Sequence, residues 1–385
     1  MKSPTAILTA VCLAGCAARA PLAEPSSPPL VCPSSHCAWT GLADLVDSAV
    51  AAGAAPGVVV AVSVRGVRYI HGSGRLGLED ATVPDPGTIY DLASLTKVVA
   101  LTTGLIFAVE EGRLSLDTPI RQYLPAFQGP GKDAITLRQL LTHSSGLPAH
   151  RRLWEQSPGR EGALALVNAT PLDTIPGAQM VYSDLGAMVM TEALESVYGT
   201  RIDTLMRTRL FLPLDLRSTT YLPPAEWRNR IAPTERDPWR GRVLRGEVHD
   251  ENASWLGGVS GHAGLFSSAA DLLRFGEWFL ARRKGPGSAV TREFTRRQNV
   301  VPGSSRALGW DTPSPNSSAG TRLSPESFGH TGFTGTSIWM DPSRELVVVL
   351  LSNRVHPSRD NPRLGPLRPL VADRAVEILL GSVVH

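Results

Sequence analysis

Strand-forming patterns gather near the two ends of the chain. Residues 57–64 form a continuous apolar run, and residues 67–70 follow after a short turn as a second strand. Near the carboxyl end, residues 336–340 and 345–351 repeat this arrangement around another turn. We therefore expect two strand pairs, one from each end of the chain.

Helical spacing dominates the remaining sequence. Residues 39–53 place apolar side chains on one stripe, which predicts an amphipathic helix. Residues 94–111 are apolar over much of their surface and precede Gly112, a residue typical of helix C-termini. Further helices are predicted at residues 136–142, 162–168, 184–198, 203–210, 271–282 and 370–380.

This order of elements predicts an α/β fold. One central antiparallel sheet would combine strands from both chain ends, with helices flanking it and a mostly helical subdomain inserted between the strand pairs. The helix that starts at Ser94 would begin at the junction of the two parts. Clefts at such junctions are common ligand sites.

The first residues are typical of an exported protein. Lys2 precedes a short apolar run, and the sequence Leu-Ala-Gly before Cys16 matches a bacterial lipobox. We expect a lipoprotein-type signal peptide over residues 1–15, lipidation of Cys16 and a flexible Pro- and Ser-rich tether over residues 16–38. The alternative is an ordinary signal peptide cut near Ala20. Both predict export, and the lipid would anchor the protein to a bacterial membrane facing the periplasm or the cell surface.

All four cysteines precede the main domain, which we place at residues 39–385. Cys32 and Cys37 could form a local disulfide in an oxidising compartment, or remain free thiols in the tether. The main domain therefore offers no thiol nucleophile and no Cys-ligated zinc.

The charge of the chain argues against one class of partner. The chain has 38 Lys and Arg against 35 Asp and Glu, a net charge of +3, and its basic residues are dispersed. This distribution gives no indication of a nucleic-acid partner.

We expect a monomer that acts on a small substrate and needs no cofactor.

Ser94 and Lys97 are the first candidates for chemistry. Residues at i and i+3 share a helix face, so the lysine can reach the serine hydroxyl. A serine hydroxyl needs an adjacent base to attack at neutral pH, and a lysine can serve if burial or a neighbouring cation lowers its pKa. The alternative is a solvated helix face, which the apolar neighbours of the pair disfavour.

Two later segments add candidates. Tyr182 could share the proton transfer, and Asp184 could orient Lys97 or a substrate amide. The segment His330, Thr331 and Gly332 precedes the late strand pair, where a small glycine lets a substrate backbone lie alongside, and Phe333 can supply an oxyanion N–H. Taken singly, each of these residues could be purely structural.

A metal site is also considered. His249, Asp250, Glu251 and His262 are all ligand types, but no zinc-binding helix pattern accompanies them. Three consecutive residues cannot easily converge on one ion. We therefore expect a hydrogen-bonded loop beside the cleft and no metal.

In this order and spacing, the three segments resemble the motifs of the serine β-lactamase and penicillin-binding-protein superfamily, Ser-x-x-Lys, Tyr-x-Asn and Lys-Thr-Gly. The resemblance covers residues 40–382 and is greatest to class C β-lactamases, DD-peptidases and esterase relatives. The segment 246–258 looks most like the lipoproteins typified by penicillin-binding protein 4B, which are regarded as weak D-Ala-D-Ala carboxypeptidases.

The resemblance implies that Ser94 is acylated and that water then hydrolyses the acyl-enzyme. Lys97 and Tyr182 would share base and acid duties, with the N–H groups of Ser94 and Phe333 as the oxyanion hole. Asp184 stands where the family has asparagine. His330 also differs from the family, which has at this position a lysine that favours a substrate carboxylate.

Three functions remain open. The first is a serine acyl-hydrolase acting on a D-Ala-type peptide or a β-lactam, although the two replacements disfavour efficient β-lactam turnover. The second is a carboxylester hydrolase, and the third is a non-catalytic lipoprotein that binds muropeptide. For the first, we expect hydrolysis of an anionic substrate to weaken as pH rises through the pKa of a partly charged His330.

Overall fold

The computed structural model describes Met1, residues 36–286 and residues 288–381 of the chain. The expected signal peptide, the lipidation site Cys16 and the Cys32 partner of the expected disulfide lie outside these residues. Helix α1 spans His36–Ala51 and so begins slightly before the expected end of the tether.

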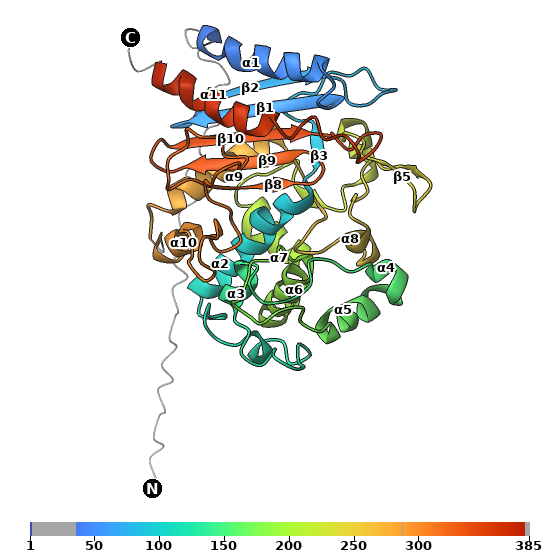
Figure 1. Ribbon diagram of the computed structural model, residues 1–385, viewed down its shortest axis with the longest axis vertical. Helices are drawn as coiled ribbons and strands as arrows, with labels where there is room; N and C mark the ends of the chain where they lie inside the picture. The colour runs from blue at the N-terminus through green and yellow to red at the C-terminus, as the bar shows by residue number, and fades with distance from the viewer. Residues whose placement is uncertain (2–35, 287, 382–385) are drawn as a thin grey trace.

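The central sheet joins both ends of the chain, as predicted (Figure 1). Its five strands are antiparallel to their neighbours. In spatial order they are β2 (Val67–Gly74), β1 (Gly57–Val64), β10 (Leu346–Ser352), β9 (Thr336–Asp341) and β8 (Phe328–Gly332). Strand β1 pairs with β10, so the central contact of the sheet links residues from opposite ends of the sequence.

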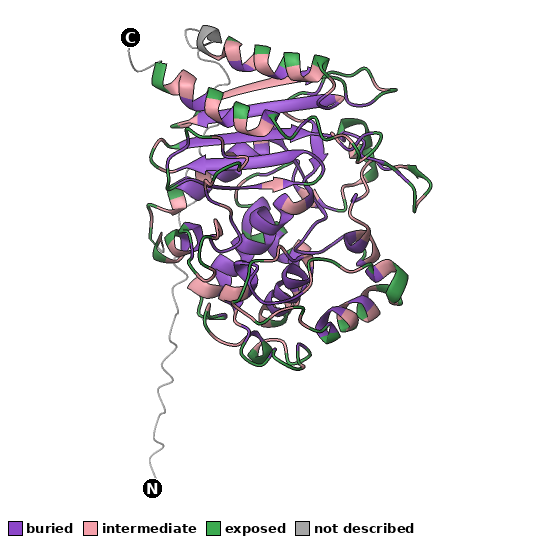
Figure 2. Ribbon diagram, in the orientation of Figure 1, coloured by how far each residue is buried: buried purple, intermediate pink, exposed green. Residues whose placement is uncertain are grey.

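Helices cover both faces of this sheet. Alternate residues of β1 enter two different cores, because successive side chains of a strand point to opposite faces. Helices α1 and α11 (Leu367–Gly381) pack on one face, where Leu42, Val60 and Val376 are fully buried. Helix α9 (Ala269–Arg282) covers the other face, and the strands between the layers are buried (Figure 2).

The inserted part is mostly helical. Its helices are α2 (Thr103–Glu110), α3 (Leu137–Leu141), α4 (Leu153–Gln156), α5 (Gly159–Ala169), α6 (Asp184–Tyr198), α7 (Ile202–Met206), α8 (Glu251–Trp255) and α10 (Ser288–Thr295). Short strands complete it: β3 (Ile89–Asp91), β7 (Leu265–Ser268) and β4 (Thr220–Tyr221) form one sheet, and β5 (Arg236–Asp237) pairs with β6 (Arg242–Val243).

The expected helix over residues 94–111 is not a regular α-helix throughout. A 3₁₀ turn, η1 (Ala93–Leu95), leads into a π-helical segment, η2 (Lys97–Thr102), before regular α2 begins. The stretch Ala93–Glu110 has a mean hydropathy of 1.4 and is long enough to cross a membrane, but 83% of it is buried inside the protein. We interpret it as the core helix of the inserted part.

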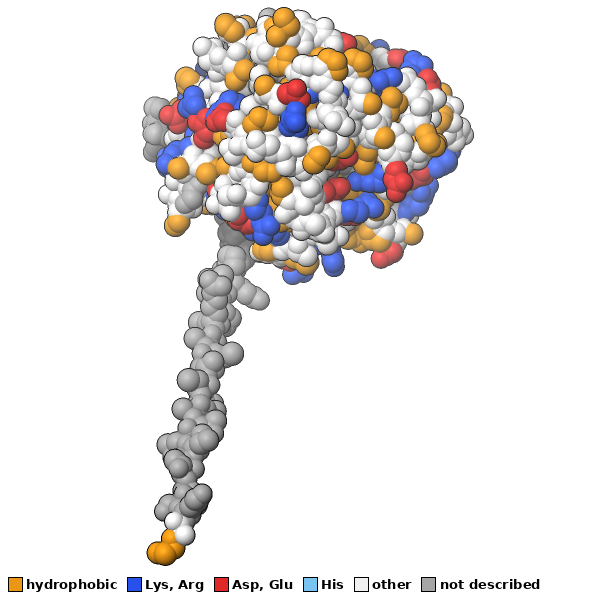
Figure 3. Space-filling model, turned by 90° about the horizontal axis from the view of Figure 1, so that it is seen from below, with side chains coloured by type: hydrophobic (Ala, Val, Ile, Leu, Met, Phe, Trp, Pro, Cys, Tyr) orange, Lys and Arg blue, Asp and Glu red, His pale blue; other side chains and the backbone are white. Residues whose placement is uncertain are grey.

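On the face of the molecule seen in Figure 3, basic and acidic side chains are interspersed. This arrangement agrees with the small net charge of +3. That face carries no extended basic patch of the kind that binds nucleic acid.

Candidate active site

The backbone around Ser94 is held in a tight turn. Ala93 has a φ of 46°, in the left-handed region that non-glycine residues rarely adopt. The Asp91 carboxylate stabilises this turn by accepting the Ala93 N–H at 2.8 Å and, through its other oxygen, the His249 N–H at 2.6 Å. The turn presents the Ser94 side chain at the start of the helical segment, where backbone N–H groups are unsatisfied.

The central sheet supports the same turn from the other side. The hydroxyls of Thr334 and Thr336 donate to the carbonyls of Asp91 and Leu92 at 2.7 and 3.0 Å. Strand β8 comes so close that a Cβ added to Gly332 would lie 2.4 Å from the Leu92 carbonyl oxygen. Glycine at this position therefore allows the sheet edge and the serine turn to touch.

Lys97 lies next to Ser94 and is almost fully buried, with 4% of its surface exposed. Its Nζ donates to Ser94 Oγ and to the His262 carbonyl, both at 3.0 Å, and lies 2.7 Å from Asp184 Oδ1. Burial alone would lower the pKa of Lys97, but Asp184 and Tyr182 outweigh it and raise that pKa above its ordinary value. The condition for a lysine base, a lowered pKa, is therefore not met, and the raised pKa of Lys97 favours its ammonium form at neutral pH.

Asp184 is placed to orient the lysine. It is the first residue of α6, whose N-terminus is capped by the Ser183 hydroxyl. Of the two roles expected for Asp184, the ion pair with Lys97 is the one that this geometry favours over a contact with a substrate amide.

Tyr182 lies against Lys97, whose Nζ is 5.0 Å from the centre of the tyrosine ring. His143 holds the tyrosine in place: its ring centre is 4.4 Å from that of Tyr182, and its Nδ1 accepts the Ser183 N–H at 3.1 Å. The His143 carbonyl also accepts the Val181 N–H at 2.8 Å. The backbone on both sides of Tyr182 is thus tied to one histidine.

His330 lies on β8 and is buried, with its Nδ1 2.7 Å from the Thr331 carbonyl oxygen. A carbonyl only accepts, so Nδ1 carries the hydrogen and Nε2 is left as an acceptor. Burial, followed by the positive charges of Arg306 and Lys97, lowers the pKa of His330 well below its usual range. His330 is therefore neutral at neutral pH, in contrast to the partly charged side chain that we expected from the sequence.

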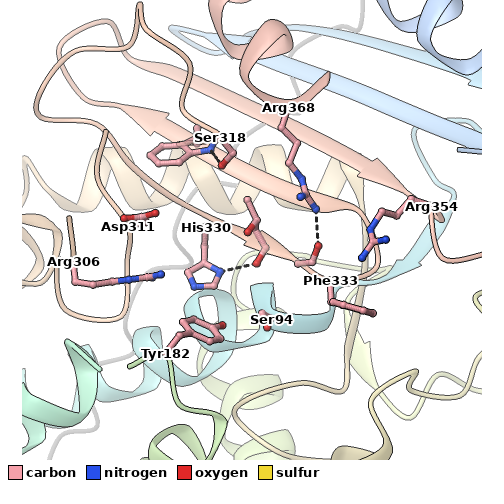
Figure 4. A pocket seen from close by; sticks show the side chains of 12 residues that line it. Ser94, Tyr182, Arg306, Asp311, Ser318, His330, Phe333, Arg354 and Arg368 are labelled. Atoms are coloured by element: carbon pink, nitrogen blue, oxygen red, sulfur yellow. Dashed lines mark hydrogen bonds between the residues drawn. The ribbon is translucent and has the colours of Figure 1, made fainter. Parts of the chain in front are cut away.

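A cavity of about 490 Å³ brings these groups together (Figure 4). Its lining residues are Ser94, Tyr182, Arg306, Asp311, Ser318, His330, Thr331, Gly332, Phe333, Trp339, Arg354 and Arg368. Of the residues predicted for catalysis and substrate binding, all except Lys97 and Asp184 line the cavity. Lys97 contacts Ser94, and Asp184 pairs with Lys97. Ser94 and Phe333 share the cavity, as an oxyanion hole formed by their N–H groups would require.

Three arginines line the cavity, with Arg306 at one end beside Tyr182 and Arg354 at the other end beside Phe333 (Figure 4). Arg306 Nε and Nη1 are buried and have no hydrogen-bond partner within the described part of the chain. The guanidinium carbon of Arg306 lies 5.3 Å from the Tyr182 ring centre, and Arg368 donates to the Gly332 carbonyl at 2.6 Å. Burial and then the charge of Arg354 lower the pKa of Arg368 to about 10, so it remains charged at neutral pH.

No sequence pattern indicated that these arginines belong to the site. Arg306 comes from the loop before Asp311, whereas Arg354 and Arg368 follow the last strand of the sheet. They are dispersed among many arginines, and only the fold brings them to one cavity.

The side chains considered as metal ligands form separate pairs instead. His249 Nε2 lies 2.8 Å from Glu235 Oε2, and His262 Nε2 lies 2.9 Å from Asp250 Oδ1. Glu251 accepts from Arg359 at 2.8 Å. No group of three or more possible metal ligands converges in the part of the chain that the structure describes.

Together, a serine in a tight turn, a buried ammonium and a tyrosine at the edge of an antiparallel sheet define a serine hydrolase. The comparison with known families gives the particular kind: residues 42–373 match the family described as Beta-lactamase. The chain belongs to this family, within the superfamily of serine β-lactamases and penicillin-binding proteins.

Relatives and solved structures agree with this assignment. An Escherichia coli K12 protein named "Putative D-alanyl-D-alanine carboxypeptidase" is 33% identical over 76% of this chain and 75% of its own length. A penicillin-binding protein homologue from Caulobacter crescentus shares the fold with a TM-score of 0.71 and 22% identity, covering 90% of this chain and 98% of that one. An octameric homologue from Pyrococcus abyssi has a TM-score of 0.70 and 22% identity, covering 89% and 77%.

Proposed function

We propose that this serine hydrolase is a D-Ala-D-Ala carboxypeptidase-like enzyme that works through an acyl-enzyme at Ser94. The observation that carries the proposal is the buried Arg306 in the cavity beside Ser94, which has unpartnered N–H groups among the described residues. A peptide that ends in D-Ala offers a carboxylate for this guanidinium. The name of the Escherichia coli relative supports the same substrate class.

Acylation would begin with attack of Ser94 Oγ on the carbonyl carbon of the penultimate residue. The Lys97 ammonium, 3.0 Å from Ser94 Oγ, favours the developing alkoxide. Because Lys97 already holds its proton, we assign the proton transfer to the Tyr182 hydroxyl, which acts as a relay. As the phenolic oxygen takes the serine proton, the phenolic proton of Tyr182 passes to the leaving amine and the C–N bond breaks.

Deacylation reverses these roles. Water attacks the ester carbonyl and gives a proton to the Tyr182 oxygen, the phenolic proton of Tyr182 passes to Ser94 Oγ, and the ester C–O bond breaks. The products are the shortened peptide and free D-Ala. The oxyanion formed in each half-reaction lies between the N–H groups of Ser94 and Phe333 in this proposal.

The test compares wild type with Ser94→Ala on a D-Ala-D-Ala peptide, nitrocefin, fluorescent penicillin and a short p-nitrophenyl ester. We expect peptide turnover by the wild type and no labelling or turnover by the variant. Undiminished labelling of Ser94→Ala would overturn the nucleophile assignment. Turnover of the ester alone would replace this proposal by a carboxylester hydrolase.

The carboxylate requirement has its own test, the same peptide with its terminal carboxylate converted to an amide. We expect kcat/KM to fall about 100-fold on amidation in the wild type, since buried charged contacts are worth several kcal/mol. Arg306→Gln should lose most of this discrimination. Equal rates on acid and amide would show that the arginines do not select the substrate.

We also propose that the enzyme acts in the cell envelope, anchored by lipid on Cys16. Support comes from the leader and lipobox in the sequence, which lie outside the described residues. Mass spectrometry of the mature N-terminus should find a diacylglyceryl cysteine, whereas a free terminus near Ala20 would indicate an ordinary secreted form.

For the oligomeric state, we propose a monomer, although an octameric homologue from Pyrococcus abyssi shows that this fold can assemble. The full chain has a mass of 41.1 kDa. Light scattering on the protein without its lipid should give this mass or slightly less. A multiple of that mass would refute the monomer.

A further inference from the structure

The two residues of the proposed oxyanion hole belong to parts of the chain that are distant in sequence. Ser94 lies at the start of the helical segment, whereas Phe333 lies in the turn between β8 and β9, and both enter the same cavity (Figure 4). An oxyanion hole stabilises charge only when its donors are held where the oxyanion forms. A residue that contacts both segments can therefore set the distance between the two donors.

His249 contacts both of these segments. Its backbone N–H donates to Asp91 Oδ2 at 2.6 Å, and the other oxygen of this carboxylate accepts the Ala93 N–H at 2.8 Å. The imidazole of His249 stacks on the Phe333 ring, with the ring centres 5.7 Å apart and an angle of 26° between the ring planes. Because Ala93 shares a peptide group with the Ser94 N–H, one histidine is linked to both donors.

The imidazole of His249 is itself held in place. Only 4% of His249 is exposed, and its Nε2 lies 2.8 Å from Glu235 Oε2. A carboxylate only accepts, so Nε2 carries the hydrogen. Burial would raise the pKa of Glu235, but bonds from His249 and Arg359 lower it to about 2, so this carboxylate is ionised at neutral pH. The ring therefore cannot turn away without taking a donor from a buried charge.

Phe333 needs such support, because 49% of it is exposed on the cavity wall. Its backbone is held on one side, where Arg368 donates to the Gly332 carbonyl of the peptide group that also carries the Phe333 N–H. The guanidinium carbon of Arg354 lies 4.7 Å from the Phe333 ring centre, but Arg354 is partly exposed. The buried neighbour of the ring is His249.

We propose that His249 is a positioning residue that holds the Phe333 N–H at the oxyanion position through the stacked rings. His249 does not line the active-site cavity, so it acts through Phe333 and Asp91 and not on the substrate. This inference rests on the proposed acyl-enzyme at Ser94. Since loss of a whole oxyanion donor costs about 100-fold or more in rate, we expect a displaced donor to cost about tenfold.

Two variants separate the ring of His249 from its hydrogen bond. His249→Phe keeps a ring against Phe333 and loses the bond to Glu235, whereas the amide of His249→Gln can still reach Glu235 but offers no ring. Both variants keep the backbone N–H that Asp91 accepts. We expect His249→Gln to slow acylation by fluorescent penicillin about tenfold and His249→Phe to stay close to the wild type. The reverse order would assign the effect to Glu235 and refute the proposal.

A double-mutant cycle tests whether His249 acts through the Phe333 ring. Phe333→Ala keeps the backbone N–H and removes the ring, so His249→Gln should slow acylation no further in that background. Equal slowing by His249→Gln with and without the Phe333 ring would contradict the proposed route.

Infrared spectroscopy of the acyl-enzyme gives a readout that lost stability alone does not change. Hydrogen bonds from the oxyanion hole lower the stretching frequency of the ester carbonyl on Ser94, which an isotope-labelled penicillin makes visible. We expect a higher frequency in His249→Gln than in the wild type. An unshifted carbonyl in that variant would overturn the proposal.

The matched control is Tyr69→Ala. Tyr69 stacks on Trp39 with the ring centres 5.4 Å apart and 15° between the planes, and it belongs to β2 at the opposite edge of the sheet from β8. Loss of this ring should lower the stability of the protein and leave the acylation rate and the carbonyl frequency unchanged.

Hydrogen exchange in the free enzyme separates this inference from the proposed function. If the wild type forms no acyl-enzyme with penicillin, peptide or ester, the proposed function fails, and the exchange of the amides of residues 332–336 decides the role of His249. These amides should exchange faster in His249→Gln than in Tyr69→Ala, and equal exchange would refute the positioning role. An acyl-enzyme that forms in the wild type and is unchanged in His249→Gln would refute that role alone.

Discussion

Proton positions at the active site are decided by residues far apart in the sequence. Asp184 raises the pKa of Lys97, whereas burial and Arg306 lower the pKa of His330. The sequence alone left the direction of the lysine pKa open and suggested a partial charge for the histidine. Motifs could identify Ser94, Lys97, Tyr182 and His330 as neighbours, but not their protonation, because that depends on packing and distant charges.

Asp184→Asn tests the role assigned to the lysine. Without the carboxylate, burial dominates and the pKa of Lys97 falls, so the ammonium is lost at lower pH. We expect the alkaline loss of Ser94 acylation to shift to lower pH, measured with a p-nitrophenyl ester. An unchanged profile would mean that the ammonium is not required.

The same variant should also be less stable. Since the folded-state pKa of Lys97 is raised, the ion pair stabilises the protein below the pKa of an unfolded lysine, and this contribution disappears as pH rises through the folded pKa. At pH 7 we expect a loss of about 3 kcal/mol, measured by denaturant unfolding. Asp133→Asn, at an exposed ion pair, is the matched control and should lose less than about 1 kcal/mol.

His330 yields a pH prediction of the opposite kind to the one drawn from the sequence. Because the pKa of His330 is lowered well below its usual range, the side chain does not titrate between about pH 6 and 8. The ratio of kcat/KM for the D-Ala-D-Ala peptide to that for its amide should therefore be flat over this interval. A ratio that falls steeply over this interval would mean that His330 is charged at its lower end.

At the scale of elements, the segment that carries Ser94 is shaped by the strands it touches. Apolar periodicity correctly predicted helical structure after Ser94 but not the 3₁₀ turn and π-helical segment. Those irregularities accompany the left-handed Ala93 and the contacts from Asp91 and strand β9. Local sequence predicts a regular helix, and tertiary contacts distort its first turns where the nucleophile lies.

Gly332→Ala tests the close approach of β8 to this turn. The added Cβ would lie 2.4 Å from the Leu92 carbonyl oxygen and 2.1 Å from Thr336 Oγ1, so the strand and the serine turn must separate. We expect acylation by fluorescent penicillin to slow about 100-fold, since displacements near 1 Å cost that much.

The matched control is Gly41→Ala in helix α1. Its added Cβ would have its nearest neighbour, Arg374 Nη1, at an ordinary 3.6 Å. We expect unchanged acylation and a gain in stability of about 1 kcal/mol, because alanine favours a helix interior. Normal acylation of Gly332→Ala would show that the turn does not depend on the close contact.

At the scale of the whole molecule, one apolar core unites the sheet and the inserted helices. Val59 of β1, Leu105 of α2, Val189 of α6 and Phe279 of α9 belong to the same buried cluster. The order of helices and strands predicted the α/β class and the sheet built from both ends. It could not predict the arginine-lined cavity, because dispersed arginines have no periodicity that indicates which of them meet.

This shared core predicts cooperative unfolding. Thermal unfolding followed by far-UV circular dichroism should coincide with loss of Ser94 labelling and with the change in fluorescence of the buried Trp310. Separate midpoints for the sheet and the helices would indicate two independent units.

The contacts that Thr334, in the turn before β9, and Thr336, in β9, make with the serine turn also determine when the site can form. Ser94 is synthesised early, yet Thr334 and Thr336, which hold its turn, belong to the last fifth of the chain, and β10 must still insert beside β1. A ribosome-bound or partly translocated chain therefore contains the nucleophile without its support. The enzyme becomes active only when its synthesis is nearly finished.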